Sequence, residues 1–266
     1  MTAKPIKKAC KHTDLASELV RPRVKKIDEL ISVTTVSVSA ADAEKIGKPE
    51  GVYTSAVSPI VAGGDTNSYP RLIRALARVL EKYIGGAKKV LVAGLGNPEM
   101  KADSLGAETL RFAAAGEKIK TFLPNVSAAT GTESFDLIRA VVREIGPDVV
   151  IAADALCAAS VKRLGTVFQV SDAGITPGSG VGNSRREISA KTLGVPVIGV
   201  GVPCVVYSRT IALETGGNGK NAGEIILTLG EIDRVARDAG AVIGEAINVA
   251  AGVVPKNSCF NSDKVV

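Results

Sequence analysis

The sequence predicts an α/β fold, a three-layer sandwich in which a mainly parallel sheet is covered by helices on both faces. Two features of the 266 residues predict it. Short apolar runs typical of buried strands alternate with longer segments in which apolar residues recur every three or four positions. Glycine or proline separates these segments. Strands joined through helices form right-handed crossovers, which place neighbouring strands parallel.

In the first half of the chain, strands are recognised by apolar alternation or short apolar runs, and helices by apolar spacing and the glycines that end them. A Gly-Gly-Asp turn at 63–65 precedes the first helix. The expected elements are strands at 31–40 and 51–61, a helix from Ser68 to Gly85, a strand at 89–93, a helix at about 103–115 and a short strand at 118–124.

In the second half, two segments match the capping box Thr-x-x-Glu, in which two side chains satisfy backbone N–H groups at a helix start. Thr130 and Glu133 precede a helix that ends at Gly146–Pro147, and Thr228 and Glu231 precede the helix of the tail. Further strands are expected at 149–153, 165–172 and 195–202, and a glycine-rich connector at 216–224.

Composition indicates one globular domain with an aliphatic core. Hydrophobic residues make up 45% of the chain, aromatic residues only 3%, and tryptophan is absent. No internal repeat or clear domain break is found, so we expect a single α/β domain over residues 15–266, preceded by a basic leader at residues 1–14. The four cysteines are far apart and no apolar run is long enough to span a membrane, so we expect a reducing, cytoplasmic location without membrane attachment.

The net charge of +6 comes from 33 basic and 27 acidic residues, and much of the excess falls near the start of the chain. A basic segment can bind nucleic acid or an acidic partner. Aromatic residues are not interleaved with these charges, so we expect a solvated leader rather than direct contact with nucleic acid.

A single histidine, His12, narrows the chemistry that the chain can perform, because it lies in the basic leader. Ser–His–Asp and Cys–His catalysis and His-ligated metal sites are nearly excluded, and we expect neither a metal nor a cofactor. The GLGN run at 94–97 lacks the further glycine spacing of a dinucleotide-binding loop. The GGNGK run at 216–220 does not fit the Walker phosphate-binding pattern.

Asp103 and Asp154 are the candidate catalytic residues. Each comes after an apolar run predicted to be a buried strand, Val90–Ala93 and Val149–Ala153. Sites of α/β proteins form where parallel strands end, so we expect the two carboxyl groups to lie near each other. Two carboxyl groups that share a water molecule cannot both ionise cheaply, so one keeps its proton and serves as the acid. Each aspartate could instead cap a following helix, and position alone favours that structural role.

A long glycine-rich loop at Ser171–Ser189 is the second candidate part of a site. Long ordered loops in compact domains are commonly functional, although the glycines could also serve only the turns of a crossover. Backbone N–H groups of such a loop can line a cleft, and its arginines can attract an acidic substrate. The candidate cleft residues are Asn97 in the GLGN run and Asp172, Asn183 and Arg185 in the loop.

Five segments together resemble the spore germination protease family. They are HTDLASE at His12–Glu18, GLGNPEMKADSLG at Gly94–Gly106, VVIAADALCA at Val149–Ala158, QVSDAGITPGSGVGNSRREIS at Gln169–Ser189 and TLGVPVIGVGVPCVV at Thr192–Val206. The fourth segment is far more specific than any short glycine motif, and the match extends over most of the chain.

The resemblance implies an endopeptidase that degrades small acid-soluble spore proteins when spores germinate, in the cytoplasm of the spore core. It implies that Asp103 and Asp154 are the essential aspartates, and that the enzyme is made as a tetrameric zymogen that loses an N-terminal propeptide. The TDLASE run looks like a cleavage site, so we expect self-cleavage between Asp14 and Leu15. Two departures from the family pattern are that Lys101–Ala102 replaces the usual Thr-Pro and that the connector before the last helix is short.

Two other functions stay open. Hydrogenase-maturation endopeptidases share the expected fold and place acidic residues at equivalent positions to sense nickel, although they also use histidine, which this chain lacks beside the site. The second is a non-catalytic relative that binds DNA or spore proteins through the basic leader. Salt-dependent DNA binding without peptide cleavage would favour that function.

Overall fold

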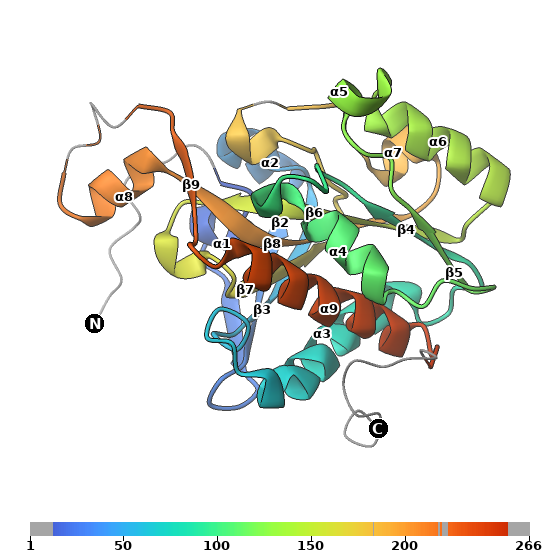
Figure 1. Cartoon of the computed structure of the whole chain (residues 1–266), viewed down its shortest axis with the longest axis horizontal. Helices are drawn as coiled ribbons and strands as arrows, with labels where there is room; N and C mark the ends of the chain where they lie inside the picture. Colours follow the sequence, from blue (N-terminus) through green and yellow to red (C-terminus); the bar gives the residue numbers. More distant parts are fainter. Residues whose placement is uncertain (1–12, 183, 218, 220–222, 255–266) are drawn as a thin grey trace.

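The computed structural model describes residues 13–254 except 183, 218 and 220–222. In this part of the chain, nine strands form one sheet in the order β1-β2-β3-β7-β8-β6-β4-β5, with β9 paired to β8 (Figure 1). The strands are β1 (Arg23–Lys26), β2 (Ser32–Val38), β3 (Gly51–Val57), β4 (Val90–Gly94), β5 (Ile119–Phe122), β6 (Val149–Ala158), β7 (Val167–Ser171), β8 (Val197–Tyr207) and β9 (Ile226–Thr228). The α-helices are α1 (Ala16–Leu19), α2 (Ala40–Ile46), α3 (Tyr69–Ile84), α4 (Leu105–Phe112), α5 (Ser127–Thr130), α6 (Ser134–Ile145), α7 (Ala190–Leu193), α8 (Ser208–Glu214) and α9 (Ile232–Ala250).

The sheet is mixed because only part of it is built by crossovers through helices. β5, β4, β6 and β8 are parallel neighbours, whereas the pairs from β1 to β3, β3–β7, β7–β8 and β8–β9 are antiparallel. Parallel neighbours need a connection of about a dozen residues or more. β7 follows β6 after only residues 159–166, so the chain returns in the opposite direction. The α/β class is confirmed, with the correction that the sheet is mixed rather than mainly parallel.

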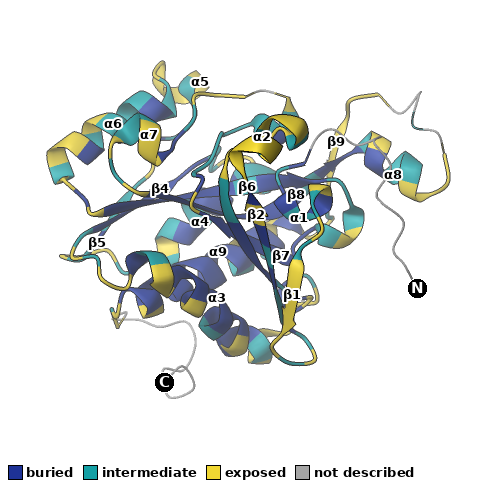
Figure 2. Cartoon of the chain, turned by 180° about the vertical axis from the view of Figure 1, so that it is seen from behind, coloured by how far each residue is buried: buried dark blue, intermediate teal, exposed yellow. Residues whose placement is uncertain are grey.

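Helices cover both faces of the sheet, as predicted. α3, α4 and α9 pack together on one face, and α6 lies on the other. The central strands are buried on both sides, and Figure 2 shows them in dark blue. In β4, Val90 and Val92 contact the core on the α9 side, while Leu91 and Ala93 contact the core on the α6 side. Since alternate side chains of a strand point to opposite faces, a strand covered twice needs a continuous apolar run.

The tail helix α9 confirms the predicted apolar stripe. All of its predicted inward-facing residues are buried: Ile232, Val235, Ala239, Val242, Ile243, Ala246 and Ile247. The stripe lies against α3 and α4 as well as the sheet. Burial of such a stripe holds a helix of this length in place more strongly than its intrinsic helix propensity does.

The two predicted capping boxes are wrong. Thr130 is the last residue of α5, which ends at a glycine in the left-handed conformation, and α6 starts only after Glu133. Thr228 belongs to β9, and its hydroxyl donates a hydrogen bond to the carbonyl oxygen of Cys204 at 2.6 Å. Neither Glu133 nor Glu231, the residues before α6 and α9, forms a side-chain cap.

Among the described residues, no helix combines the length and the apolar content that crossing a membrane requires. Cys157 and Cys204 are buried thiols that form no disulfide. Cys10, Cys259 and His12 lie outside the described residues, as does nearly all of the basic leader. The predicted boundary between leader and domain therefore stays a prediction.

Candidate functional site

A cavity of about 850 Å³ opens where β4 stops pairing with β6. The last pair joins Gly94 to Ala153, whereas β6 continues to Ala158. β8 contributes Gly199 and Gly201 to the lining, and at these positions a Cβ would lie 2.5 Å from the carbonyl oxygens of Gly174 and Asp154. Glycine within a strand often marks a place where a ligand or another backbone approaches closely.

Asp154 lies inside β6 rather than at its end. It pairs with Gly201 of β8, it lines the cavity, and only 5% of it is exposed. Its Oδ1 accepts a hydrogen bond from the N–H of Ala155 at 2.9 Å. The alternative that Asp154 caps a helix is wrong, because the strand continues beyond it.

Asp103 ends the short 3₁₀ helix η2 (Lys101–Asp103) and also lines the cavity. Its Oδ2 accepts a hydrogen bond from the N–H of Asn97 at 2.7 Å, which closes the loop that leaves β4. The residue before α4 is Ser104, and no side-chain cap is formed there. Asp103 therefore organises the loop instead of capping α4, and its half-buried carboxyl group faces the same cavity as Asp154.

Burial is the main reason why the pKa of each carboxyl group is raised. The pKa of Asp154 lies well above its usual value because of burial, then because of the negative charges of Asp103 and Asp14, and the Ala155 N–H opposes the shift only in part. Burial also raises the pKa of Asp103, against the hydrogen bond from Asn97. A carboxyl group with a raised pKa keeps its proton to a higher pH than a free carboxyl group does, as a general acid requires. The site can thus supply one acid and one base, which titrate as a coupled pair.

The structure brings one of the predicted cleft residues to the cavity. Arg185 lines it and forms an ion pair with Glu133, with 3.3 Å between Nη1 and Oε1. Asn97 contributes its backbone N–H to the η2 loop but is absent from the cavity lining. Asp172 is exposed, and its Oδ1 accepts a hydrogen bond from a backbone N–H of β3, away from the cavity. Asn183 lies outside the described residues.

The segment Thr13–Glu18, which contains the predicted self-cleavage site, reaches the same cavity at Asp14. Asp14 lines it, and its N–H donates to a carbonyl oxygen of β6 at 2.8 Å. Leu15 has no exposed surface and packs against apolar side chains of β6, β7 and β8. Gln169 holds both sides of this residue: its Nε2 donates to the carbonyl oxygen of Asp14 at 3.0 Å, and its Oε1 accepts from the N–H of Ala16 at 3.1 Å. The Asp14–Leu15 peptide is therefore held at the wall of the cavity.

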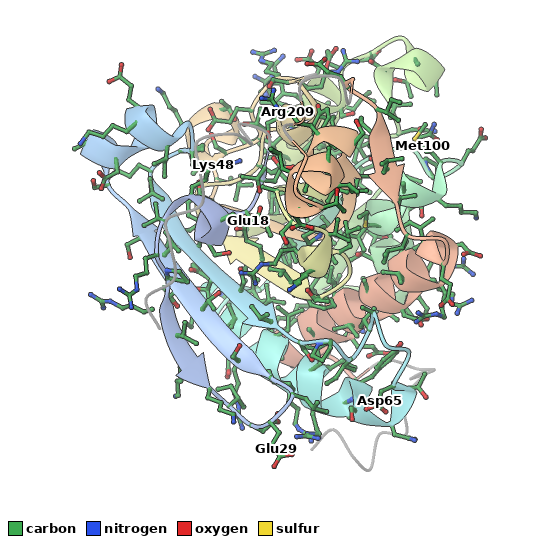
Figure 3. All side chains as sticks on the ribbon, turned by 90° about the vertical axis from the view of Figure 1, so that its left-hand side faces the viewer. Glu18, Glu29, Lys48, Asp65, Met100 and Arg209 are labelled. Atoms are coloured by element: carbon green, nitrogen blue, oxygen red, sulfur yellow. The ribbon has the colours of Figure 1, made fainter. Side chains whose placement is uncertain are left out.

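Two residues around Asp14 were not predicted. Ser179 of the 3₁₀ helix η4 (Ser179–Val181) donates its hydroxyl to Oδ1 of Asp14 at 2.8 Å. Nζ of Lys48 lies 3.6 Å from the same oxygen. Figure 3 shows Lys48 beside α2, on the same side of the molecule as Glu18. No local pattern could have revealed these contacts, because the fold alone brings the three segments together.

The described part of the chain shows no cluster of side chains suited to bind a metal ion. It holds no group of three or more histidine, cysteine, aspartate or glutamate side chains placed to bind one ion. The lining of the cavity includes the carboxyl groups of Asp103 and Asp154 and the backbone of the glycine-rich loop. The expected absence of metal and cofactor stays a prediction.

Sequence comparisons bear out the resemblance noted above. The family model for germination protease matches residues 6–216. A germination protease from Clostridium acetobutylicum is 37% identical over 227 residues, which cover 77% of this chain and 69% of the relative. One from Bacillus velezensis is 38% identical over 205 residues, which cover 70% of this chain and only 56% of the relative. The chain thus spans a little over half to about two thirds of the curated relatives it matches.

Among solved structures, the NiFe hydrogenase maturation protease HycI from Thermococcus kodakarensis KOD1 is similar at 17% sequence identity. The match has a TM-score of 0.41 and covers 64% of this chain and 99% of that chain. Similarity at this level supports no argument about chemistry.

Proposed function

The chain belongs to the germination protease family, and from this premise we propose that it is an endopeptidase that degrades small acid-soluble spore proteins during germination. Asp103 and Asp154 carry the proposed reaction. The observation that supports it best is the meeting of two carboxyl groups, from η2 and β6, in one cavity where burial raises the pKa of each. We include in the proposal action in the cytoplasm of the spore and assembly as a homotetramer.

In the proposed reaction, the ionised carboxyl group removes a proton from a water molecule as the water oxygen attacks the carbonyl carbon of the scissile peptide. The protonated carboxyl group then gives its proton to the leaving nitrogen as the carbon–nitrogen bond breaks. The products are a new carboxyl terminus and a new amino terminus. One proton remains on the pair, now on the group that acted as the base, and exchange with water restores the starting state.

The proposal includes self-cleavage between Asp14 and Leu15. The position of Asp14 in the lining of the cavity that holds Asp103 and Asp154 supports it. The charge of Asp14 is also near enough to contribute to the raised pKa of Asp154. Removal of residues 1–14 would separate the predicted basic leader from the predicted domain at residues 15–266.

The test compares the full chain with Asp103→Asn and Asp154→Asn. Asparagine keeps the shape of each side chain but cannot act as acid or base, so each variant should cleave at least about a hundredfold more slowly. Asp65→Asn is the matched control, since Asp65 is exposed and lies far from Lys48 in Figure 3. The measurements are the mass of the chain over time and the fragments of an added small acid-soluble spore protein. Cleavage by either active-site variant at the rate of the control would refute the mechanism, and salt-dependent DNA binding without any cleavage would favour the non-catalytic alternative.

A further inference from the structure

The carboxylate of Asp14 is held by three separate groups. Its Oδ1 accepts a hydrogen bond from the hydroxyl of Ser179 at 2.8 Å and lies 3.6 Å from Nζ of Lys48. Its Oδ2 accepts a hydrogen bond from the backbone N–H of Cys157 at 2.9 Å. The side chains of Lys48 and Asp14 are only 11% and 15% exposed. These contacts come from three elements, the end of α2, the strand β6 and the short helix η4.

Several carboxyl groups line the cavity, so a cation beside Asp14 offsets the repulsion between their negative charges. Asp14 shares the lining of the cavity with Glu44, Asp103, Glu133 and Asp154, and its charge disfavours ionisation of Asp154. Among the described residues that line the cavity, the cations are Lys48 and Arg185. Arg185 pairs with Glu133 at 3.3 Å, so Lys48 is the cation that faces the carboxylate of Asp14.

The position of Lys48 is built into the fold. The helix α2 ends at Gly47, whose φ of 66° lies in the left-handed region, and this turn directs the chain back along the helix. The N–H of Lys48 then donates to the carbonyl oxygen of Ala43 at 3.2 Å. The backbone of Lys48 is therefore anchored, and its long side chain reaches into the cavity from a defined point.

The other hydrogen bonds to the segment Thr13–Glu18 do not depend on the side chain of residue 14. Gln169 bonds only to backbone groups, the carbonyl oxygen of Asp14 and the N–H of Ala16. These bonds set the register of the peptide for any residue type. Leu15 fills an apolar pocket next to them. Selection of an acidic residue at position 14 must therefore come from the groups that meet its carboxylate.

We propose that Lys48, Ser179 and the backbone N–H of Cys157 form the subsite that selects an acidic residue immediately before the cleaved bond, in this chain's own Asp14 and in substrate polypeptides. The assignment rests on the proposed peptidase function. An aspartate or glutamate in this subsite gains a cation and two hydrogen-bond donors. An asparagine keeps the space but loses the ion pair and part of the hydrogen bonding, and a lysine meets a like charge.

The experiment uses full-length chains in which residues 14 and 48 are changed singly and together. The variants are Lys48→Met, Lys48→Glu, Lys48→Arg, Asp14→Asn, Asp14→Lys, the double change Lys48→Met with Asp14→Asn, and the charge swap Asp14→Lys with Lys48→Glu. Lys45→Met is the matched control, because Lys45 lies on α2, three residues before Lys48, with its side chain 75% exposed. Two readouts are taken: the rate and position of self-cleavage, and amide hydrogen exchange of residues 13–19 in chains that also carry Asp154→Asn.

We expect Lys48→Met and Asp14→Asn each to speed exchange of the segment and to slow cleavage by roughly ten- to a hundredfold, the range for hydrogen bonds and ion contacts to a charged group. The two changes together should cost little more than either alone, because both remove the same contact. Lys48→Arg and the charge swap should restore most of the loss, which a merely structural role of Lys48 would not produce.

Two outcomes would overturn the subsite. One is exchange in Lys48→Met equal to that in Lys45→Met, and the other is cleavage of the Asp14→Asn chain at the rate of the parent chain. If no chain is cleaved at all, the proposed function fails, while the exchange measurements still decide whether Lys48 holds Asp14. If cleavage occurs but ignores residue 48, the function stands and the subsite assignment is wrong.

Discussion

Replacing Gly106 with alanine measures how closely α4 must approach the sheet to place the two aspartates. A methyl group on Gly106 would lie 2.7 Å from the carbonyl oxygen of Ala153 and closer still to the backbone nitrogen and oxygen of Leu95. Ordinary contact begins at about 3.4 Å, so the helix and the strands would have to separate by at least about 0.7 Å. All three neighbours are backbone atoms, which cannot turn aside as the end of a side chain can.

Overpacking of this kind costs about 1–3 kcal/mol, and contact with backbone on two sides places Gly106→Ala at the upper end. The better helix propensity of alanine offsets up to about 1 kcal/mol. We therefore expect the free energy of unfolding to fall by about 2 kcal/mol or more. The same displacement moves Asp103, just before α4, relative to Asp154, which follows Ala153. Cleavage should then fall by more than the loss of folded protein explains.

The assay is urea unfolding followed by circular dichroism, together with the rate of self-cleavage by mass. Gly116→Ala is the control, because its methyl group would meet nothing closer than 3.9 Å, and we expect a change within about 0.5 kcal/mol. A Gly106→Ala chain as stable as this control would refute the steric argument. A destabilised chain with unchanged cleavage per folded molecule would refute the claim that the approach of α4 sets the geometry of the aspartates.

Three further predictions concern buried polar groups. The pKa of Asp154 is raised in the fold above its ordinary value of 3.8, so its contribution to stability is fully present below pH 3.8 and is lost as the pH rises through the folded pKa. Asp154→Asn should therefore make the free energy of unfolding, measured in urea from pH 4 to 8, fall less steeply with pH. Equal slopes in the parent chain and the variant would contradict this prediction. The side chain of Asn248 is fully buried and forms two hydrogen bonds of 2.8 Å at the end of α4, with the N–H of Ala114 and the carbonyl oxygen of Phe112. Asn248→Ala should therefore lower the free energy of unfolding by about 2–4 kcal/mol. A loss below about 1 kcal/mol would contradict this prediction. Burial raises the pKa of Cys204 to about 12, so the thiol should react with iodoacetamide at pH 8 only after urea unfolding. Peptide masses measure the labelling. Labelling of Cys204 in the native chain would show that the thiol is accessible and would contradict the prediction.

The main elements were predictable because burial leaves a periodic trace in the sequence. β4 and β6 are covered on both faces and therefore read as continuous apolar runs, and α9 presents one apolar stripe. β1 and β9 have only exposed residues, so they carry no alternation and were not predicted. The antiparallel half of the sheet was missed for a related reason, since apolar runs show that a strand is buried but not which way its neighbour runs.

The site was predictable only in part. The rule that sites of α/β proteins gather at strand ends led to Asp103 and Asp154 as candidates, and both line the cavity, although β6 continues past Asp154. Lys48 and Ser179 have no such marker. Ser179 is 165 residues away from Asp14, and only the folded chain brings them together. Asp172 shows the reverse case, where a polar residue at a strand end bonds to a neighbouring strand instead of the cavity.

The complete burial of Leu15 and Ala16 has a consequence for any polypeptide that would take the place of this segment. The two corresponding side chains of that polypeptide must become buried in this protein. They can do so only where they are not already buried in the polypeptide's own tertiary structure. A globular protein with a folding free energy of about 7 kcal/mol exposes such a segment in roughly one molecule in 10⁵. An unstructured chain exposes it in all of them. If the chain acts as the proposed peptidase, the cleft therefore excludes stably folded proteins that carry the same six residues, whatever the charge of the residue before the cleaved bond.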